Sequence, residues 1–501
     1  MTTNAPAVSA DTEFEMVIGL EVHAQLRTES KMFCRCAANY AAADPNTHVC
    51  PVCQGLPGVL PVINQKAVEW VIKTALALDL EIPELSKFDR KNYHYPDLMK
   101  GYQISQFDMP LSLKGYLDVT VDGETRRIGI TRIHLEEDTA RLLHRSNEAA
   151  ESYSLLDVNR SGVPLMEIVS EPDLRSPEEA RAYLVALRQI LRYLGVSAAD
   201  MEKGSFRCDA NISLRPQGST ELGTKVEIKN MNSFRGVYKA LQFELQRQTE
   251  ALRRGERLLQ ETRGWAEDRE VTLSQRSKEY ANDYRYFPEP DLPPLQISRE
   301  WVEEIRSTLP ELPAQKLARF QQQYGLATFE ANLLTEERAR ADYYERAVEA
   351  LGEPAGANAA QAKAIANWMV GEMARLMNDA GHALEEVKIE PAQIGALVRL
   401  IDDGTISTKL AKGVFETMYA SGKDPQSIVA ESGQTQISDE SELRSVVTGV
   451  VSEQGAAVED YRAGKEEALK FLVGQVMKAT RGRANPQLAN RILREILDAG
   501  S

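Results

Sequence analysis

The chain has 501 residues, of which 43% are hydrophobic and 27% charged, a composition ordinary for a globular protein of two or three domains. Its net charge of −15 argues against a protein that coats nucleic acid nonspecifically, although it leaves room for a local basic surface. The first dozen residues have neither the basic nor the apolar region of a secretory signal, so we expect none, and no run approaches the roughly 18 apolar residues of a membrane span. We therefore expect a cytoplasmic protein without membrane contact, with a disordered segment over residues 1–14.

Residues 15–297 predict a mixed domain of strands and helices. Asn64 can cap a helix, and Val121–Glu124 is typical of a tight hairpin turn, since Asp-Gly supplies the positive φ angles that such a turn needs. Ser176 begins a capping box, and the helix that follows ends at Gly195. Because the strand runs and helices do not alternate as βαβ units, we predict an α+β fold with an antiparallel sheet.

Four stretches of this domain alternate polar and apolar residues, as a strand with one buried face does. They are Glu21–Gln25, His134–Glu136, Arg207–Ser213 and Lys225–Lys229. Their polar positions carry mainly carboxylates, imidazoles and cations, whereas solvated strand faces usually carry Thr, Ser and scattered Lys or Glu. The pattern predicts a sheet face that binds a cation and a nucleotide.

The acidic residues of these stretches predict a divalent metal site. Glu21 and His23 share one strand face, His134 and Glu136 share another, and Glu167 lies in a short apolar run. Two carboxylates 4 Å apart repel by roughly 4 kcal/mol at an effective dielectric near 20, so their clustering requires a cation. Oxygen ligands with one imidazole suit Mg²⁺ or Mn²⁺ better than zinc. The alternative is that these are solvated acids on separate strands.

A nucleotide would lie on the sheet face, because the chain has neither a Walker A loop nor a Gly-x-Gly-x-x-Gly segment. The residues assigned to the nucleotide and its phosphates are Arg160, Arg207, Asp209, Asn211, Lys225 and Lys229. Two further polar and aromatic stretches, 91–97 and 102–106, either line a pocket or form a packed loop. The chain also lacks a nucleophile segment suited to amide hydrolysis.

Two short pairs of cysteines predict a zinc site. Cys34 and Cys36 are followed, after thirteen residues, by Cys50 and Cys53. Tetrahedral zinc takes thiolate ligands, and closely spaced cysteines let one turn supply two of them. A pair of disulfides is the weaker alternative in a chain without an export signal. We expect four thiolates to fill the zinc shell, so that the segment 34–53 is a structural insertion and not a catalytic one.

The remainder of the chain is predicted to be helical. Four prolines between Phe287 and Pro294 mark a boundary near Ile297, and a second break is expected near Gly404. These breaks define a helical domain over 298–404 and an all-α tail over 405–501. From residue 461 onward, eight Lys or Arg residues stand against four acids, giving +4. This is either a basic binding surface or a solvated helical face.

Taken together, these residues resemble the GatB family, the B subunits of the bacterial glutamine-dependent aspartyl/glutamyl-tRNA(Asn/Gln) amidotransferases. The strings that carry the resemblance are Ile18–Leu26, Lys87–Tyr93, Tyr102–Gln106, Cys208–Ser213, Asp283–Pro290, Phe471–Lys478 and Ala484–Gln487. They are long and are spread over nearly the whole chain.

The resemblance implies that the chain works in a heterotrimer with two partners, an amidase (glutaminase) and a small third subunit. A GatB protein would use ATP and Mg²⁺ to phosphorylate the side-chain carboxylate of Glu or Asp misacylated onto tRNA(Gln) or tRNA(Asn). Ammonia from the partner amidase would then displace the phosphate. The cognate nondiscriminating aminoacyl-tRNA synthetase is a further candidate partner.

The resemblance also implies a cradle domain related to glutamine synthetase, followed by the helical domain and a tail that binds tRNA. It carries the Mg²⁺ and catalytic role onto Glu21, His23, Glu136 and Glu167; strand phase favours Glu136 over the two acids that follow it. Within the tail, the residues assigned to tRNA are Lys470, Lys478, Arg481 and Arg483. The four cysteines occur in only some members, so zinc depends on their spacing alone.

Two other functions compete with this interpretation. The first is an ATP-dependent amide ligase acting on a free small acid, which would have no use for a helical domain and a basic tail. The second is a zinc-stabilised, noncatalytic tRNA-binding scaffold. Such a scaffold would have no reason to cluster carboxylates on the polar faces of its strands.

Overall fold

The computed structural model describes residues 13–146, 152–277, 284–352, 359–432, 440–480 and 483–499. They fall into two compact units, 1–312 and 313–501. Of the predicted disordered N-terminus, residues 1–12 lie outside the described part, and Phe14 already begins the first strand.

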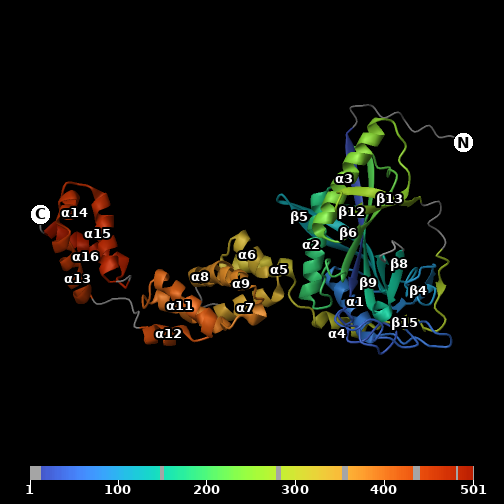
Figure 1. Ribbon diagram of the computed structural model, residues 1–501, viewed down its shortest axis with the longest axis horizontal. Helices are drawn as coiled ribbons and strands as arrows, with labels where there is room; N and C mark the ends of the chain where they lie inside the picture. Colours follow the sequence, from blue (N-terminus) through green and yellow to red (C-terminus); the bar gives the residue numbers. More distant parts are fainter. Residues whose placement is uncertain are drawn as a thin grey trace. The chain divides into compact units, whose positions relative to one another are not determined.

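The first unit contains the strands and the longest helices (Figure 1). Its strands are β1 (Phe14–Gln25), β2 (Leu85–Ser86), β3 (Asp89–Asn92), β4 (Tyr102–Ser105), β5 (Ser112–Val121), β6 (Glu124–Glu137), β7 (Arg141–Ser146), β8 (Ser152–Asp157), β9 (Pro164–Ser170), β10 (Phe206–Pro216), β11 (Val226–Met231), β12 (Glu261–Ala266), β13 (Val271–Ser277), β14 (Phe287–Pro288) and β15 (Leu295–Gln296). Its helices are α1 (Gln65–Ala77), the 3-10 turn η1 (Val158–Arg160), α2 (Pro177–Tyr193), α3 (Phe234–Arg253) and α4 (Arg299–Ser307).

Eight strands form one large sheet in the order β13-β12-β11-β10-β1-β9-β6-β5. Every neighbouring pair is antiparallel except β11 and β12, which confirms the predicted α+β class with a mainly antiparallel sheet. A three-stranded sheet, β14-β3-β4, lies beside it, and β4 packs against β6.

The alternating pattern of the strands places one sheet face in the core. In β1, Leu20, Val22 and Ala24 are buried, whereas Glu21 and His23 between them stay partly exposed. Helices α1, α2 and α3 pack on strands of this sheet, and their apolar residues share one continuous core with β1. The opposite face is therefore left for polar chemistry.

Local sequence patterns predicted several boundaries correctly. Asn64 caps α1 by accepting hydrogen bonds from the amides of Lys66 and Ala67, and Ser176 caps α2. Asp122 and Gly123 have φ angles of 51° and 84°, as required by the tight turn between β5 and β6.

The second unit is entirely helical in its described part, which confirms the predicted helical C-terminal region. One core contains α5 (Pro313–Tyr324), α6 (Thr328–Thr335), α7 (Arg338–Glu349), α8 (Ala359–Asn367), the π-helical turn η2 (Trp368–Met373), α9 (Ala374–Ala380), the 3-10 turn η3 (Leu384–Glu386), α10 (Pro391–Asp402), α11 (Thr408–Ser421) and α12 (Pro425–Ser432). A separate core contains α13 (Glu440–Glu453), α14 (Gly455–Arg462), α15 (Glu466–Ala479) and α16 (Pro486–Ala499).

The boundaries between these bodies differ from the expected ones near residues 297 and 404. Helix α4 packs against α1 and buries Val302 and Ile305 in the first core, so the first unit continues to Leu312. Likewise, Phe415 and Val429 from α11 and α12 belong to the core of α5–α10, and the next core begins with α13. In both cases apolar packing, which is not local in sequence, sets the boundary.

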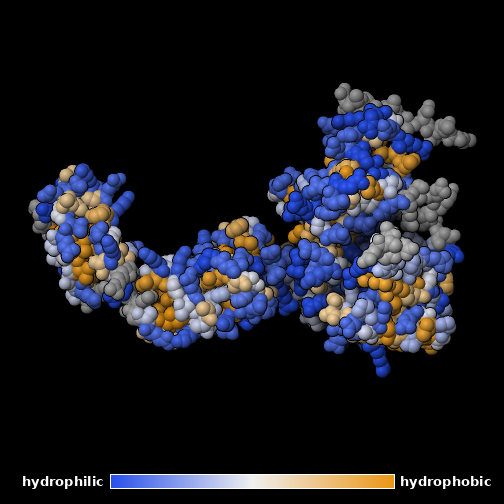
Figure 2. Space-filling model, viewed as in Figure 1, coloured by the Kyte–Doolittle hydropathy of each residue, from blue (hydrophilic) through white to orange (hydrophobic). Residues whose placement is uncertain are grey.

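No helix of the described residues is both long and apolar enough to span a bilayer. On the face of the molecule seen in Figure 2, hydrophilic residues predominate and apolar residues form separate small patches.

Candidate active site

The polar face of the large sheet brings together residues that are more than a hundred positions apart in sequence. On β1, His23 pairs with Glu167 of β9, and Glu167 pairs in turn with His134 of β6. The Nε2 atom of His23 lies 3.4 Å from Oε2 of Glu167 and 3.8 Å from Oε1 of Glu136. Ligand atoms of His23, Glu136 and Glu167 all lie within 4.8 Å of one another. One imidazole and two carboxylates at this spacing fit a small divalent cation that prefers oxygen.

The charges of this cluster influence one another strongly. Burial alone would raise the pKa of Glu167, but the imidazoles of His134 and His23 outweigh it, so this pKa lies well below its usual range. Burial alone would lower the pKa of His23, but Glu167 and Glu136 outweigh it and raise this pKa. Positive charge is therefore stabilised at the point where the two carboxylates meet, whether a proton or a cation supplies it.

Glu21 occupies a neighbouring position on the same strand face. Its Oε1 accepts a hydrogen bond of 2.8 Å from Nδ2 of Asn211, and the residue faces Asp209 across the β1–β10 pair. Glu21 lines the same cavity as the cluster, but it is not among the three residues whose ligand atoms meet. Strand phase predicted correctly that Glu21 and His23 share the polar face of β1. Only the side-chain packing separates Glu21 from the cluster of His23, Glu136 and Glu167.

A cavity of about 470 Å³ opens over the cluster. Of the residues predicted to bind the nucleotide, Arg207, Asp209, Lys225 and Lys229 line this cavity. Lys229 is ion-paired with Asp209 and Glu227. Burial alone would lower the pKa of Lys229, but these two carboxylates outweigh it and raise this pKa. The cavity wall on the β10–β11 side therefore carries both carboxylates and cations, and its cations can bind phosphate oxygens.

Two predicted nucleotide-binding residues lie elsewhere. Arg160 donates hydrogen bonds to the carbonyl oxygens of Thr139 and Ala140, at 2.9 and 2.8 Å, and it is not among the residues lining the cavity. Asn211 lines a smaller adjoining cavity of about 220 Å³, whose wall also includes Glu21. The guanidinium of Arg160 supports the backbone after β6, a role that its position in the sequence did not reveal.

The cavity also contains residues outside the predicted metal-binding and nucleotide-binding sets. They are Lys91, Tyr93, Gln103, Gln106, Phe107, Arg132, His134, Asp138, Thr139, Leu165, Glu227, Tyr284 and Tyr286. Several come from the stretches 91–97 and 102–106, whose two interpretations were a pocket or a packed loop; Lys91, Tyr93, Gln103 and Gln106 take part in the pocket. Burial would lower the pKa of Lys91, but Glu136 and other neighbouring groups outweigh it and raise this pKa, so the ammonium stays charged.

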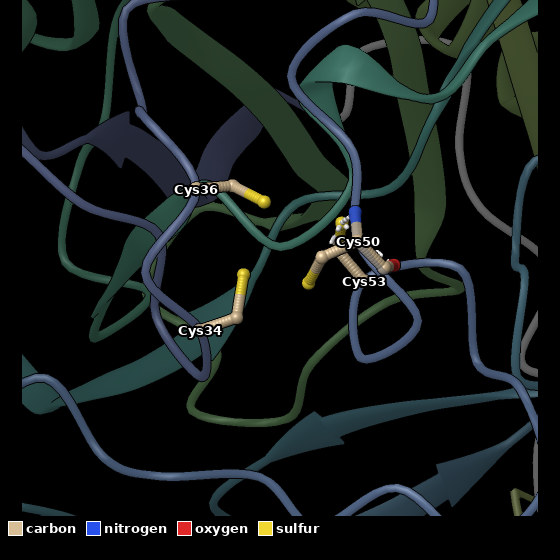
Figure 3. Close-up of side chains that lie close together, drawn as sticks. All are labelled: Cys34, Cys36, Cys50 and Cys53. Carbon is tan, nitrogen blue, oxygen red and sulfur yellow. Dashed lines mark hydrogen bonds between the residues drawn. The ribbon is translucent and has the colours of Figure 1, made fainter.

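The four cysteines of the predicted zinc insertion converge at a second site (Figure 3). All four Sγ atoms lie within 4.8 Å of one another, and those of Cys50 and Cys53 are 3.9 Å apart. Tetrahedral zinc with Zn–S bonds of 2.3 Å requires sulfur atoms ~3.8 Å apart, whereas a disulfide requires about 2 Å. All four thiols are free, so the arrangement fits a metal and not disulfides.

The surroundings of the cysteines favour thiolate at one position. A hydrogen bond from the Cys34 thiol lowers the pKa of Cys53 to about 4; burial opposes this shift, and the charge of Lys31 reinforces it. Lys31 is fully buried and donates to the carbonyl oxygen of His48 at 2.8 Å. The imidazole of His48 is not part of the group of four sulfurs, in agreement with a shell made of thiolates alone.

The described basic residues predicted to contact tRNA lie on the surface of α15 and just after it. Lys470 and Lys478 are exposed on α15, and Arg483 follows the helix, with its Nε 3.4 Å from the carbonyl oxygen of Thr480. Arg481 lies outside the described residues. The two lysines are therefore available to a partner.

Comparison with known proteins matches two family models to this chain. Residues 16–303 match the GatB/GatE catalytic domain, and residues 350–497 match the GatB domain. The chain is 58% identical over 485 residues to the B subunit of the aspartyl/glutamyl-tRNA(Asn/Gln) amidotransferase of Carboxydothermus hydrogenoformans, covering 97% of this chain and 99% of that protein. It is also 58% identical over 485 residues to the protein of the same name from Thermomicrobium roseum, with the same coverage. Identity to the corresponding protein of Dehalococcoides mccartyi is 56% over 494 residues, covering 98% of this chain and 100% of that protein.

Proposed function

Because the chain belongs to the GatB/GatE family, we propose that it is the transamidating component of an amidotransferase complex that acts on misacylated tRNA. Its substrates would be Glu-tRNA(Gln), Asp-tRNA(Asn) or both, which it would convert to Gln-tRNA(Gln) and Asn-tRNA(Asn). The observation that carries this proposal is the meeting of His23, Glu136 and Glu167 under a polar cavity that Lys225 and Lys229 also line.

The chemistry requires activation of a carboxylate, because its oxygen is a poor leaving group. A carboxylate oxygen of the substrate attacks the γ-phosphorus of ATP, the bond to the β-phosphate oxygen breaks, and an acyl phosphate and ADP form. Ammonia then attacks the acyl carbon, phosphate leaves, and a proton passes to solvent to give the neutral amide. Ammonia would come from a partner amidase, with a small third subunit completing the heterotrimer.

The residues of the cavity fit the demands of this reaction. His23, Glu136 and Glu167 would bind Mg²⁺, with Glu21 beside them on the strand. When bound, the cation neutralises charge on the phosphates of ATP. Lys225 and Lys229 would bind phosphate oxygens on the β10–β11 side, where positioning and fixed positive charge favour phosphoryl transfer.

The remaining parts of the chain would serve assembly and tRNA binding. Zinc bound by the four cysteines would be structural, because four thiolates leave no open position for a substrate. The first unit, which continues to Leu312, would correspond to a cradle domain related to glutamine synthetase, α5–α12 to the helical domain, and α13–α16 to the tRNA-binding tail. Lys470, Lys478, Arg481 and Arg483 would contact the tRNA backbone, and the reaction would take place in the cytoplasm.

The two competing functions are less well supported. A noncatalytic scaffold does not explain carboxylates and imidazoles from β1, β9 and β6 converging beneath a cavity. A ligase for a free small acid does not explain the match to the GatB domain over 350–497, outside the unit that contains the cavity.

The test is an amidation assay with the heterotrimer reconstituted from its purified components. Glu167→Gln should lower ATP-dependent amidation of Glu-tRNA(Gln) and Asp-tRNA(Asn) by at least about a hundredfold, as loss of a charge-stabilising group does. Glutamine hydrolysis by the partner amidase should persist. Amidation at the wild-type rate would contradict the proposal, as would amidation that proceeds without ATP.

A further inference from the structure

One wall of the cavity is built from aromatic rings. Tyr93, Phe107, Tyr284 and Tyr286 all line the cavity that contains the metal cluster. The rings of Phe107 and Tyr286 stack with centroids 4.2 Å apart and an interplanar angle of 9°, and Tyr284 lies edge-on to Tyr286 at 6.0 Å. We refer to these four residues as the aromatic wall.

The aromatic wall leaves apolar surface uncovered. Phe107 is 53% exposed and Tyr284 is 40% exposed. Tyr286 stacks on one face of the Phe107 ring, and a ligand would stack on the opposite face. An exposed ring that lines a polar cavity can stack with a ligand that has a flat π face.

The backbone holds these rings in place before any ligand arrives. The amide of Phe107 donates to Oδ2 of Asp89 at 3.1 Å. The side-chain amide of Asn92 donates to the carbonyl oxygen of Arg285 at 2.8 Å. The backbone amide of Asn92 donates to the carbonyl oxygen of Tyr284, also at 2.8 Å. Arg285, between the two tyrosines, has a φ of 42°, a left-handed conformation that non-glycine residues seldom adopt and that is common at binding sites.

The strand order separates the aromatic wall from the cations that suit ATP phosphates. The metal cluster lies on β1, β9 and β6. Lys225 and Lys229 lie on the β10–β11 side of it. The aromatic wall comes from the segments that directly follow β3 and β4 and precede β14, and β4 packs against β6. The two substrates of the proposed reaction therefore have two different sides of the cluster available to them.

We infer that the aromatic wall stacks the terminal adenine of the aminoacyl-tRNA, with Phe107 providing the free ring face. This inference rests on the proposed function. The amino acid is esterified to the ribose of the terminal nucleotide, so its base must lie within one nucleotide of the carboxylate that is phosphorylated. Base stacking on an aromatic ring needs no particular hydrogen-bonding edge, and Lys91, whose ammonium lies 5.1 Å from the Tyr284 ring centroid, adds positive charge for the adjoining backbone.

The experiment compares Phe107→Leu with Phe287→Leu in the reconstituted heterotrimer. Leucine keeps apolar volume but removes the flat ring. Phe287 is a matched control because it is a phenylalanine next to the same tyrosines, is 44% exposed and does not line the cavity. Kinetics would be measured with Glu-tRNA(Gln) and with ATP, and the melting temperature of each variant would confirm that it folds.

Phe107→Leu should raise the KM for aminoacyl-tRNA by about tenfold and leave the KM for ATP within about twofold, since stacking on one ring is worth on the order of tenfold or more in affinity. Phe107→Tyr should keep the wild-type KM. A tRNA with 2-aminopurine in place of the terminal adenine should lose fluorescence on binding to the wild-type complex and not on binding to Phe107→Leu.

Three outcomes would overturn the inference. In the first, Phe107→Leu raises the KM for ATP and not the KM for aminoacyl-tRNA, and the wild-type complex quenches a 2-aminopurine nucleoside triphosphate. This result would assign the aromatic wall to ATP. In the second, Phe107→Leu and Phe287→Leu have equal effects on both KM values, which would indicate a purely structural segment. In the third, Phe107→Leu changes neither of the two KM values nor the fluorescence quenching. In each case, continued ATP-dependent amidation by the wild-type complex would leave the proposed function intact.

Discussion

Replacing Glu136 by glutamine should abolish the response of the protein's thermal stability to Mg²⁺. The carboxylates of Glu136 and Glu167 each offer an oxygen within 4.8 Å of the other. At that distance two negative charges repel by about 3.5 kcal/mol at an effective dielectric of 20. Glu136→Gln removes this repulsion but also removes an attraction to His23, 3.8 Å away, so the stability without metal should change by less than that amount.

With Mg²⁺ the two proteins should diverge. At a concentration one hundred times the dissociation constant, a ligand stabilises the folded state by about 2.7 kcal/mol, which raises the melting temperature of a unit of this size by roughly 5 °C. If the substitution weakens binding a hundredfold, the remaining stabilisation is about 0.4 kcal/mol, or less than about 1 °C.

The assay is thermal unfolding in MgCl₂ and in EDTA. Glu171→Gln is the control, because Glu171 directly follows β9, is exposed and does not line the cavity, so it should keep the wild-type shift. A wild-type protein whose melting temperature ignores Mg²⁺ would refute the reasoning. So would a Glu136→Gln protein with the full shift.

Three further predictions concern other parts of the chain. Cys50→Ser should lower the zinc content measured by atomic absorption from about one per chain and should reduce the melting temperature, whereas Cys208→Ala, a change in the core, should leave zinc bound. Glu244 is fully buried; burial alone would raise its pKa, but hydrogen bonds from neighbouring side chains outweigh this and lower it. The stabilisation that ionised Glu244 provides is therefore present above the unfolded pKa of ~4.3 and is lost as pH falls through the lower folded pKa. Glu244→Gln should lower the free energy of unfolding in urea by about 2 kcal/mol at pH 7 and by progressively less below pH ~4.3. A difference that does not change with pH would contradict this. Replacing both Lys470 and Lys478 by Glu should raise the KM for aminoacyl-tRNA at least about tenfold and leave the KM for ATP unchanged. The slope of log KM against log salt concentration should fall by about one per lysine. An unaltered slope would exclude both lysines from the tRNA contact.

The sequence by itself determined the local features of this protein. Period-two alternation predicted which residues of β1 face the core, and Asn64, Ser176 and the Asp122–Gly123 turn predicted ends of elements, because caps and turns depend on a few adjacent residues. Strand phase also selected Glu136 from three consecutive acids. The structure places Glu136 in the cluster, whereas Glu137 accepts a hydrogen bond from the amide of Ile104, and Asp138 pairs with Arg207.

Only the tertiary structure decided which of these local features meet. Register between β1, β9 and β6 brings His23 beside Glu167 and leaves Glu21 bonded to Asn211, a difference that two residues of one strand face cannot reveal on their own. The same holds for the aromatic wall, where Phe107 stacks on Tyr286 from a segment far along the chain. Strand pairing and apolar packing join residues across the whole sequence, and the free energy of those contacts belongs to the assembled fold and not to any single stretch of it.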